Sequence, residues 1–310
     1  MKIFNSIQSF HSSKKTIVTI GTFDGVHLGH QKIIEQITKS AHAVNCESVV
    51  LTFFPHPRTV LQKDSEMKQL NTLDEKIILL DNLGIDNLVV HPFDKEFSRL
   101  TAEEFVKEVL VSNFNVQKII IGYDHRFGRN RTANIDDLIA FGEIYGFEVE
   151  QISAEEINEV SISSTKIRNA LLDGNVALAT TYLGLPYSVS GIVSKGKQVG
   201  RTIGFPTANI EIQENYKLIP LNGVYIVKSV IDGKIIYGMM NIGTRPTVDG
   251  TSQTIEAHFF DFNQDIYNQK ISVSLLHRMR PEQKFKSVEA LKKQLDIDKI
   301  KAENYISQLL

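Results

Sequence analysis

The sequence predicts two domains: an α/β domain with a doubly wound parallel sheet, followed by a small antiparallel β-barrel with a terminal helix. From Thr16 to about Ile152, short apolar segments alternate with amphipathic helical segments, which is typical of a parallel sheet wrapped by helices. After Leu185, closely spaced strand patterns replace the helices, and a helical pattern returns from Ser287 to Leu310. A length of 310 residues suits two domains.

The first strand expected in this domain is Thr16–Ile20, which is largely β-branched, as a buried strand demands. The later strand candidates are Val49–Phe53, Asn87–Val90, Lys118–Ile121 and Phe147–Gln151. Two of the helices between them begin with a capping box, at Thr72 and at Thr101, and the first of these should stop near Gly84. Sheets of this kind bind ligands at the carboxyl ends of their strands. Functional residues are therefore expected in the loops that follow the strands.

The strands expected in the second domain alternate in polarity: Tyr187–Val193, Gly223–Ile231, Lys234–Met240, Ile255–Phe260 and Ile271–Leu276. Asp232-Gly233 predicts a tight hairpin between two of them. Closing such strands into a barrel removes exposed edges. The domain boundary is placed near Gly184, which gives domains of residues 1–184 and 185–310.

Composition excludes several classes of protein. A net charge of -2 gives no general electrostatic reason to bind nucleic acid or an anionic membrane, so neither is expected as a partner. The single cysteine, Cys46, cannot form an intrachain disulfide, and the first residues lack the apolar core of a signal peptide. No apolar run approaches the ~18 residues of a membrane helix. The protein is expected in the cytoplasm.

The most informative stretch follows the first strand and reads Gly21-Thr22-Phe23-Asp24-Gly25-Val26-His27-Leu28-Gly29-His30. A strand that enters a helix through a glycine-rich turn aims backbone N–H groups and the positive helix end at one point, which suits a phosphate. His27 and His30 are three residues apart, and Gly29 allows close approach of a ligand. One histidine at a helix start is usually structural, but the complete string favours phosphate binding.

Three further loops carry polar strings. The segments Leu51–Arg58 and Ile121–Arg131, the second of which includes Asp124, lie at the ends of expected strands and have surface loops as their alternative interpretation. The third string is Ser163-Ser164-Thr165, with Arg168 one turn later. An N-cap explains one of these hydroxyl groups but not three followed by an arginine.

In the second domain, the segment from Ser194 to Asn209 holds glycines, lysines and an arginine, which fits a loop around phosphates. Thr207 and Asn209 lie two residues apart on an extended segment and point the same way, where a hydroxyl and an amide oxygen are hard ligands for Mg²⁺. An ordinary barrel loop is the alternative interpretation.

These strings resemble those of known families. The histidine string and Ile162-Ser163-Ser164-Thr165-Lys166-Ile167-Arg168 resemble the two signatures of the HxGH nucleotidyltransferase superfamily, whose domain is Rossmann-like. The segment Gly200-Arg201-Thr202-Ile203-Gly204-Phe205-Pro206-Thr207-Ala208-Asn209 resembles the riboflavin kinase motif, and Ile255-Glu256-Ala257-His258 and Arg280-Pro281-Glu282 are similar to later motifs of that family. Their order is that of the bacterial bifunctional riboflavin kinases and FMN adenylyltransferases.

The resemblance implies an enzyme that converts riboflavin and ATP to FMN, and FMN and ATP to FAD, with Mg²⁺ as cofactor. It implies catalytic roles for His27, His30, Arg168 and Glu256, the last as a base. It further implies that ATP for adenylylation contacts Gly21, Phe23, Asp24, Gly29, Asp124, Ser163, Ser164 and Thr165. In the kinase, ATP or flavin would contact Gly196, Lys197, Gly204, Phe205, Pro206 and Arg280, and the metal would contact Thr207 and Asn209.

The residues by themselves leave two other functions open. One is a flavin-binding or regulatory protein that keeps the fold without turnover. It would be expected to have lost phosphate or metal ligands, and these are all present in the chain. The other is a different HxGH transferase, acting on pantetheine or a cytidylyl group, against which the carboxyl half argues.

Overall fold

The computed structural model describes residues 1–62, 67–123, 125–153, 162–196, 199–247 and 250–309. It divides into two compact units, Met1–Ser164 and Thr165–Leu310. The second unit therefore begins before the boundary expected near Gly184, and it includes two helices that precede the barrel, α6 (Ser164–Leu172) and α7 (Val176–Leu183). No helix in the described part of the chain combines the length and the apolar character needed to span a membrane.

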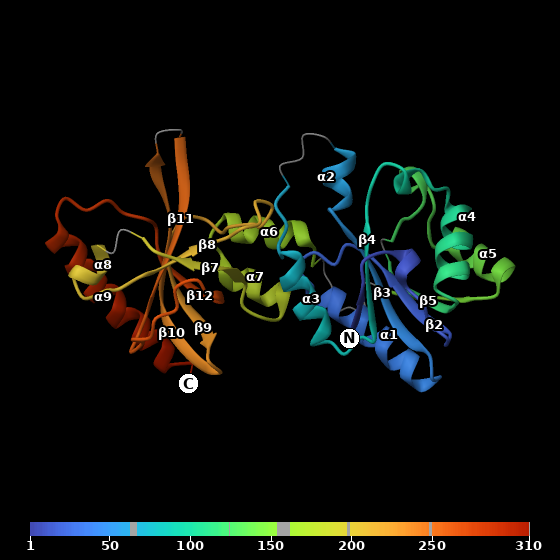
Figure 1. Ribbon diagram of the computed structural model, residues 1–310, viewed down its shortest axis with the longest axis horizontal. Helices are drawn as coiled ribbons and strands as arrows, with labels where there is room; N and C mark the ends of the chain where they lie inside the picture. Colours follow the sequence, from blue (N-terminus) through green and yellow to red (C-terminus); the bar gives the residue numbers. More distant parts are fainter. Residues whose placement is uncertain (63–66, 124, 154–161, 197–198, 248–249, 310) are drawn as a thin grey trace. The chain divides into compact units, whose positions relative to one another are not determined.

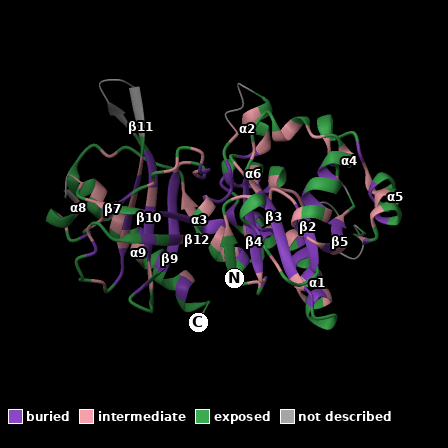
Figure 2. Ribbon diagram, turned by 45° about the vertical axis from the view of Figure 1, so that its right-hand side comes forward, coloured by how far each residue is buried: buried purple, intermediate pink, exposed green. Residues whose placement is uncertain are grey.

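The first unit is built on a six-stranded sheet in the order β1-β4-β3-β2-β5-β6, in which every pair of neighbours is parallel. Its strands are β1 (Lys2–Phe4), β2 (Thr16–Ile20), β3 (Glu47–Phe54), β4 (Asn87–Pro92), β5 (Val116–Gly122) and β6 (Glu148–Ile152). The central strands are buried along nearly their whole length (Figure 2). This agrees with the near-continuous apolar runs of the sequence.

Helices cover both faces of the sheet (Figure 1). They are η1 (Ile7–Ser9), α1 (Leu28–Ala43), α2 (Pro57–Leu61), α3 (Leu73–Asp81), η2 (Phe97–Arg99), α4 (Ala102–Glu104), η3 (Phe105–Asn113), η4 (Arg129–Arg131) and α5 (Ile135–Tyr145). One core packs α1 and α3 against strand residues such as Val50, and the other packs η1, η3 and α5 against residues such as Val49. Neighbouring strand residues thus face opposite cores, and the doubly wound fold is confirmed.

Local sequence determines where several helices begin. The capping boxes expected at Thr72 and Thr101 are both present, each with its hydroxyl accepting from a backbone N–H and the glutamate three residues later reaching back. Helix α3 ends at Asp81, and Gly84 adopts a left-handed φ of 75° in the turn after it. Helix η3 is a π-helix, which the sequence did not indicate.

The second unit is a closed barrel with the strand order β10-β11-β8-β7-β12-β9 and antiparallel neighbours, as predicted. Its strands are β7 (Ser188–Ser194), β8 (Ala208–Glu211), β9 (Gly223–Ile231), β10 (Lys234–Thr247), β11 (Gly250–Phe259) and β12 (Lys270–Arg280). The short helix α8 (Val199–Thr202) lies between β7 and β8, and α9 (Val288–Ser307) follows the barrel. Asp232 and Gly233, with φ of 49° and 74°, form the expected hairpin turn.

Helices α6 and α7 pack on the barrel. The backbone N–H of Leu221 donates to the carbonyl of Leu171 at the end of α6, with an N–O distance of 3.0 Å. Gly174, between the two helices, lies so close to Arg278 of β12 that a Cβ there would be 2.7 Å from the arginine Cδ. These contacts explain why both helices belong to the second unit.

Candidate active sites

The glycine-rich loop after β2 places both predicted histidines at the start of α1. His27 is the N-cap of this 16-residue helix, and its Nδ1 accepts a hydrogen bond from the backbone N–H of His30 at 3.4 Å. An Nδ1 that accepts carries no proton, so the proton of a neutral His27 is on Nε2, which is then a donor. The two rings stack with their centroids 3.6 Å apart. One helix end thus presents two imidazoles and the first-turn N–H groups.

Burial keeps His30 neutral. Desolvation, with smaller effects of His27 and Lys76, holds the pKa of His30 well below its usual value. The ring of Phe23 packs edge-on against it, with centroids 5.1 Å apart. An anion at this helix end would therefore meet His30 as a neutral hydrogen-bonding group, and positive potential there would come from the helix end and from other cations.

The loop itself has an unusual backbone. Phe23 and Val26 have φ of 46° and 41°, which is rare for residues other than glycine and most costly for a β-branched one, while Gly25 has 89°. Gly21 lies beneath the Phe23 ring, whose Cε2 would be 3.1 Å from a Cβ at that position. This backbone conformation must be stabilised by hydrogen bonds to residues outside the loop.

Asp24 supplies two of these bonds from a nearly fully buried position. Its carboxylate accepts from the backbone N–H of Leu70 at 2.8 Å, and its carbonyl accepts from the hydroxyl of Ser164 at 2.8 Å. Ser164 therefore supports the loop, whereas Asp24 has its carboxylate bonded within the protein. Nucleotide contacts by Gly21, Phe23, Asp24, Gly29, Ser163 and Ser164 remain predictions.

Two parts of the predicted adenylyltransferase site cannot be placed with the histidines. Asp124 lies outside the described residues. Thr165 and Arg168 are on α6 within the second unit, with Thr165 exposed and Arg168 half-buried. Their role toward the same phosphates stays a prediction.

In the barrel, strand register brings together residues that are far apart in sequence. Asn209 of β8 is directly opposite Glu256 of β11, and it is opposite Ser194 of β7 on its other side. Glu256 is in turn opposite Asn241 of β10. Directly opposed residues point to the same face with their Cβ atoms roughly 5 Å apart. The candidate base and one candidate metal ligand are therefore neighbours on one face.

The loop between β7 and β8 closes onto this row. Gly196 lies against the side-chain amide of Asn209, so close that a Cβ would be 2.7 Å from the amide carbon. Gly204 has a φ of 90°, and the N–H of Phe205 donates to the carbonyl of Gly200 at 2.9 Å, which forms a compact turn before Thr207. Lys197 lies outside the described residues.

His258, to which the sequence analysis gave no role of its own, fixes the other end of this loop. Its Nδ1 is 2.8 Å from the carbonyl oxygen of Pro206, and its ring packs edge-on against Phe205 with centroids 5.1 Å apart. Burial lowers the pKa of His258, and the bond with Pro206 opposes this effect. Pro206 and Phe205 are thus held by β11, two residues from Glu256.

Arg280, predicted to contact ATP or flavin, uses its guanidinium within the protein. Its Nε and Nη2 donate to the carboxylate of Asp298 on α9 at 3.0 and 2.7 Å, and its Nη1 donates to the carbonyl of Pro281 at 3.1 Å. Asp298 is 1% exposed and also accepts from Gln294. This buried, bidentate pair ties α9 to β12, and a direct ligand contact by Arg280 remains a prediction.

The residues proposed for Mg²⁺ fit a magnesium ion by their chemistry. Thr207 and Asn209 offer a hydroxyl and an amide oxygen, and Mg²⁺ usually keeps several waters and takes further ligands from substrate phosphates. No cluster of three or more histidine, cysteine or acidic residues able to hold a metal occurs in the described ranges. Such an ion would therefore depend on ATP for part of its coordination.

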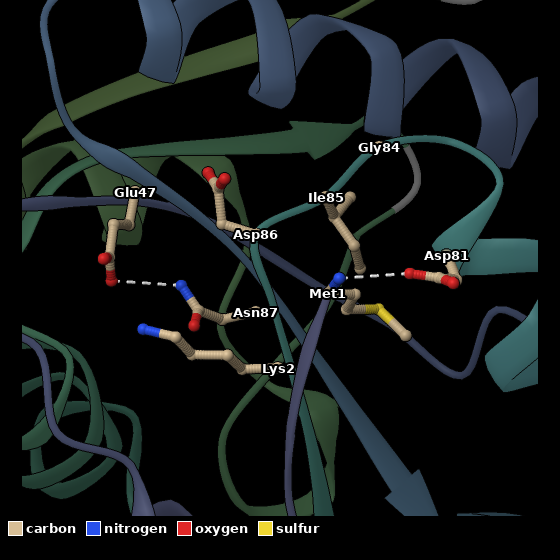
Figure 3. A pocket seen from close by; sticks show the side chains of 8 residues that line it. All are labelled: Met1, Lys2, Glu47, Asp81, Gly84, Ile85, Asp86 and Asn87. Atoms are coloured by element: carbon tan, nitrogen blue, oxygen red, sulfur yellow. Dashed lines mark hydrogen bonds and ion pairs between the residues drawn. The ribbon is translucent and has the colours of Figure 1, made fainter.

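A separate pocket of about 430 Å³ lies at the opposite edge of the parallel sheet, where β1, β3 and β4 begin (Figure 3). Its lining holds the carboxylates of Glu47, Asp81 and Asp86 together with Lys2 and the Met1 amino group. The amino group pairs with Asp81 at 3.1 Å, and Asn87 donates to Glu47 at 3.1 Å. The predicted phosphate site lies at the carboxyl edge of the sheet, in the glycine-rich loop that carries His27 and His30, called the histidine loop below.

Among the buried charged residues that the sequence analysis missed, Lys76 of α3, which is 2% exposed, and Asp298 of α9 lie at core positions of helices. Each interrupts the apolar face of its helix. Lys76 is spaced with Leu73, Ile77 and Leu80, and Asp298 with Ala302 and Ile306. A charged residue at a core position of a helical pattern was the signal that could have identified both.

Comparison with known proteins supports both halves. The family model for FAD synthetase matches residues 9–166, and the model for riboflavin kinase matches residues 183–306. The chain is 40% identical to the bifunctional riboflavin kinase/FMN adenylyltransferase of Buchnera aphidicola subsp. Schizaphis graminum, covering 94% of this chain and 96% of the relative. It is 36% identical to the Escherichia coli K12 protein of the same name, covering 98% of each.

One solved structure is similar over almost the whole chain. It is a Streptococcus pneumoniae protein described as a macrolide-efflux protein, with 32% identity, a TM-score of 0.88 and coverage of 97% of this chain and 98% of that one. Its name indicates another activity, but its fold is the fold described above. Because both family models match in the predicted order and the curated relatives align over nearly the full length, the chain belongs to the family of bifunctional riboflavin kinases/FMN adenylyltransferases.

Proposed function

We propose that this chain converts riboflavin to FMN at the face of the barrel that carries Asn209 and Glu256, and FMN to FAD at the histidine loop of the parallel-sheet unit. ATP is the second substrate of both reactions. The observation that carries the kinase assignment is the register that sets Glu256 beside Asn209. For the adenylyltransferase it is the pair His27 and His30 at the N-terminus of α1.

In the kinase step, the terminal ribityl hydroxyl of riboflavin attacks the γ-phosphorus of ATP. A new O–P bond forms, the bond from that phosphorus to the β,γ-bridging oxygen breaks, and ADP leaves. Glu256, which is opposite Asn209 and Asn241 in the strand register, accepts the hydroxyl proton. Mg²⁺ bound by Thr207 and Asn209 would neutralise phosphate charge when present.

In the adenylyltransferase step, a phosphate oxygen of FMN attacks the α-phosphorus of ATP, and pyrophosphate leaves. The nucleophile is already anionic near neutral pH, so no protein base is needed. His27, through its Nε2–H, and His30 bind phosphate oxygens together with the end of α1, and they stabilise the charge that develops in the transition state. A catalytic role for Arg168 as a cation toward the same phosphates follows from the family resemblance alone.

The two activities divide near Gly184 in this proposal, so the string from Ser163 to Arg168 serves the adenylyltransferase although α6 and α7 pack on the barrel. The proposed location is the cytoplasm. Cys46 is a buried free thiol, as expected of a protein in a reducing compartment.

Incubation of the purified chain with riboflavin, ATP and MgCl₂, followed by chromatographic separation of the flavins, tests the proposal. FMN should appear first and FAD after it, and omission of MgCl₂ should suppress FMN formation. A chain that binds flavin but forms neither product is a binding or regulatory protein. A chain that makes FMN but does not adenylylate it leaves the histidine loop without its proposed role.

A further inference from the structure

A buried lysine of helix α3 donates a hydrogen bond to the histidine loop. Lys76 lies on the inner face of α3 and is 2% exposed. Its Nζ donates a hydrogen bond of 2.7 Å to the carbonyl oxygen of Thr22, inside the glycine-rich loop. The same oxygen accepts from the hydroxyl of Thr52 at the end of β3, at 3.2 Å. Two separate elements thus fix one carbonyl of the loop.

The position of this bond within the loop is informative. Thr22 directly precedes Phe23, the first residue with a left-handed φ, and the strained segment continues to Val26 and the cap residue His27. A fixed Thr22 carbonyl determines the direction in which the backbone enters this strained segment. It also sets the direction in which the N–H groups after it point, including those at the helix start.

The charge of Lys76 acts at short range. It is near enough to His30 to lower the pKa of that histidine. It is also near enough to Asp24 for the Asp24 carboxylate to raise the pKa of Lys76, against the effect of burial. Burial nevertheless lowers the pKa of Lys76 to about 8, so the surroundings disfavour its charged form. An apolar side chain of the same length would avoid this cost, since the other residues on this face of α3 are Leu73, Ile77 and Leu80.

We propose that Lys76 is a positioning residue of the adenylyltransferase: its ammonium holds the Thr22 carbonyl, and with it the histidine loop, in the phosphate-binding conformation, and places a buried positive charge beside His27 and His30. This inference rests on the function proposed above for that loop. The charge of Lys76 stabilises the ATP triphosphate in the transition state, when pyrophosphate departs and the negative charge at the helix end is greatest. The neutral state of His30 makes a second cation at this point necessary.

Lys76→Met tests the proposal in the full-length chain, because methionine retains most of the length and loses the charge and the donors. Lys39→Met is the matched control, since Lys39 is on the neighbouring helix α1 with its side chain 69% exposed. We expect Lys76→Met to lower kcat for FAD formation from supplied FMN by ~10- to 100-fold, with KM for FMN little changed. FMN formation from riboflavin should equal that of Lys39→Met, and the thermal unfolding temperature should not fall.

Thr52→Val separates the two roles, because it removes the other donor to Thr22 and leaves the charge. It should slow FAD formation less than Lys76→Met. The proposal is overturned if Lys76→Met makes FAD as fast as Lys39→Met. It is also overturned if Lys76→Met unfolds at a lower temperature and loses near-ultraviolet circular dichroism, because Lys76 is then needed for folding. Normal FAD formation by both His27→Ala and His30→Ala would instead refute the proposed function of the loop, whatever Lys76→Met does.

Discussion

Replacing Gly196 by alanine should abolish most of the kinase activity through Asn209 alone. The φ of Gly196 is outside the left-handed region, so the backbone accepts alanine. The new Cβ would lie 2.7 Å from the side-chain amide carbon of Asn209. The atom in the way belongs to the end of a side chain, which rotates at little cost in folding free energy.

The size of the effect follows from that distance. Carbon atoms in contact are separated by about 3.5 Å, so the amide carbon of Asn209 must withdraw by about 0.8 Å from 2.7 Å, and the amide nitrogen, which lies closer still, must withdraw further. A displacement of ~1 Å in a positioned group can reduce the rate of a reaction by ~100-fold. We therefore expect FMN formation by Gly196→Ala to fall by roughly 30- to 100-fold, and its Mg²⁺ requirement to rise.

The assay is FMN formation from riboflavin in the wild type, Gly196→Ala, Asn209→Ala and the double variant. Because the alanine acts by moving Asn209, the double variant should be no slower than Asn209→Ala, and the two losses should be strongly non-additive. Adenylylation of supplied FMN is the internal control and should stay unchanged. Losses that multiply in the double variant, or an unimpaired Gly196→Ala, would refute the reasoning.

Three other predictions concern stability. Asp298→Ala leaves the Arg280 guanidinium, whose side chain is only 17% exposed, without its carboxylate and should lower the unfolding free energy of the barrel unit by ~3 kcal/mol, measured by chemical denaturation. His30 stays neutral in the folded protein, whereas in the unfolded chain it binds a proton below pH 6.5. The folded state should therefore lose stability as the pH is lowered below 6.5. His30→Asn should reduce this loss in thermal melts from pH 7.5 to 5.5. A fragment of residues 165–310 should unfold cooperatively, whereas one of residues 187–310 lacks α6 and α7 and should be less stable by several kcal/mol, because each buried apolar side chain contributes ~1.5–3 kcal/mol.

Each of these has a decisive opposite result. If Arg280→Met does not recover part of the stability lost in Asp298→Ala, the unpaired charge is not the cause. Equal pH dependence in the wild type and His30→Asn would mean that His30 titrates alike in both states, since His91 and His258, whose pKa values burial also lowers, are present in both proteins. Equal stability of the two fragments would show that the contact between Leu171 and Leu221 contributes nothing.

Much of the fold could be predicted because its information is local. The central strands β2, β3 and β4 are largely apolar runs, the capping boxes at Thr72 and Thr101 are formed from residues three apart, and Asp232-Gly233 specifies its own turn. Strand β1 was missed because it has three residues and a largely exposed pattern, and it forms by pairing with β4. A strand specified by its partner leaves little pattern in its own residues.

The candidate sites divide in the same way. His27 and His30 share one helix start, so the sequence predicts their proximity directly. The adjacency of Asn209 and Glu256 depends on the register of β8 and β11, which no local pattern determines. Lys76 was overlooked because a buried lysine contradicts the usual preference of its side chain for solvent, and only the fold reveals the carbonyl that it bonds.

The central claim is that one chain holds two separate active sites, and mixing two inactivated full-length variants tests it most directly. Glu256→Gln should adenylylate supplied FMN but make none from riboflavin, and His30→Ala should convert riboflavin to FMN and stop there. With riboflavin, ATP and MgCl₂, neither variant alone should give FAD at a wild-type rate, and an equimolar mixture should give it, because free FMN passes from one protein to the other. If Glu256→Gln also fails to adenylylate supplied FMN, or if the mixture accumulates FMN without FAD, the two-site account is contradicted.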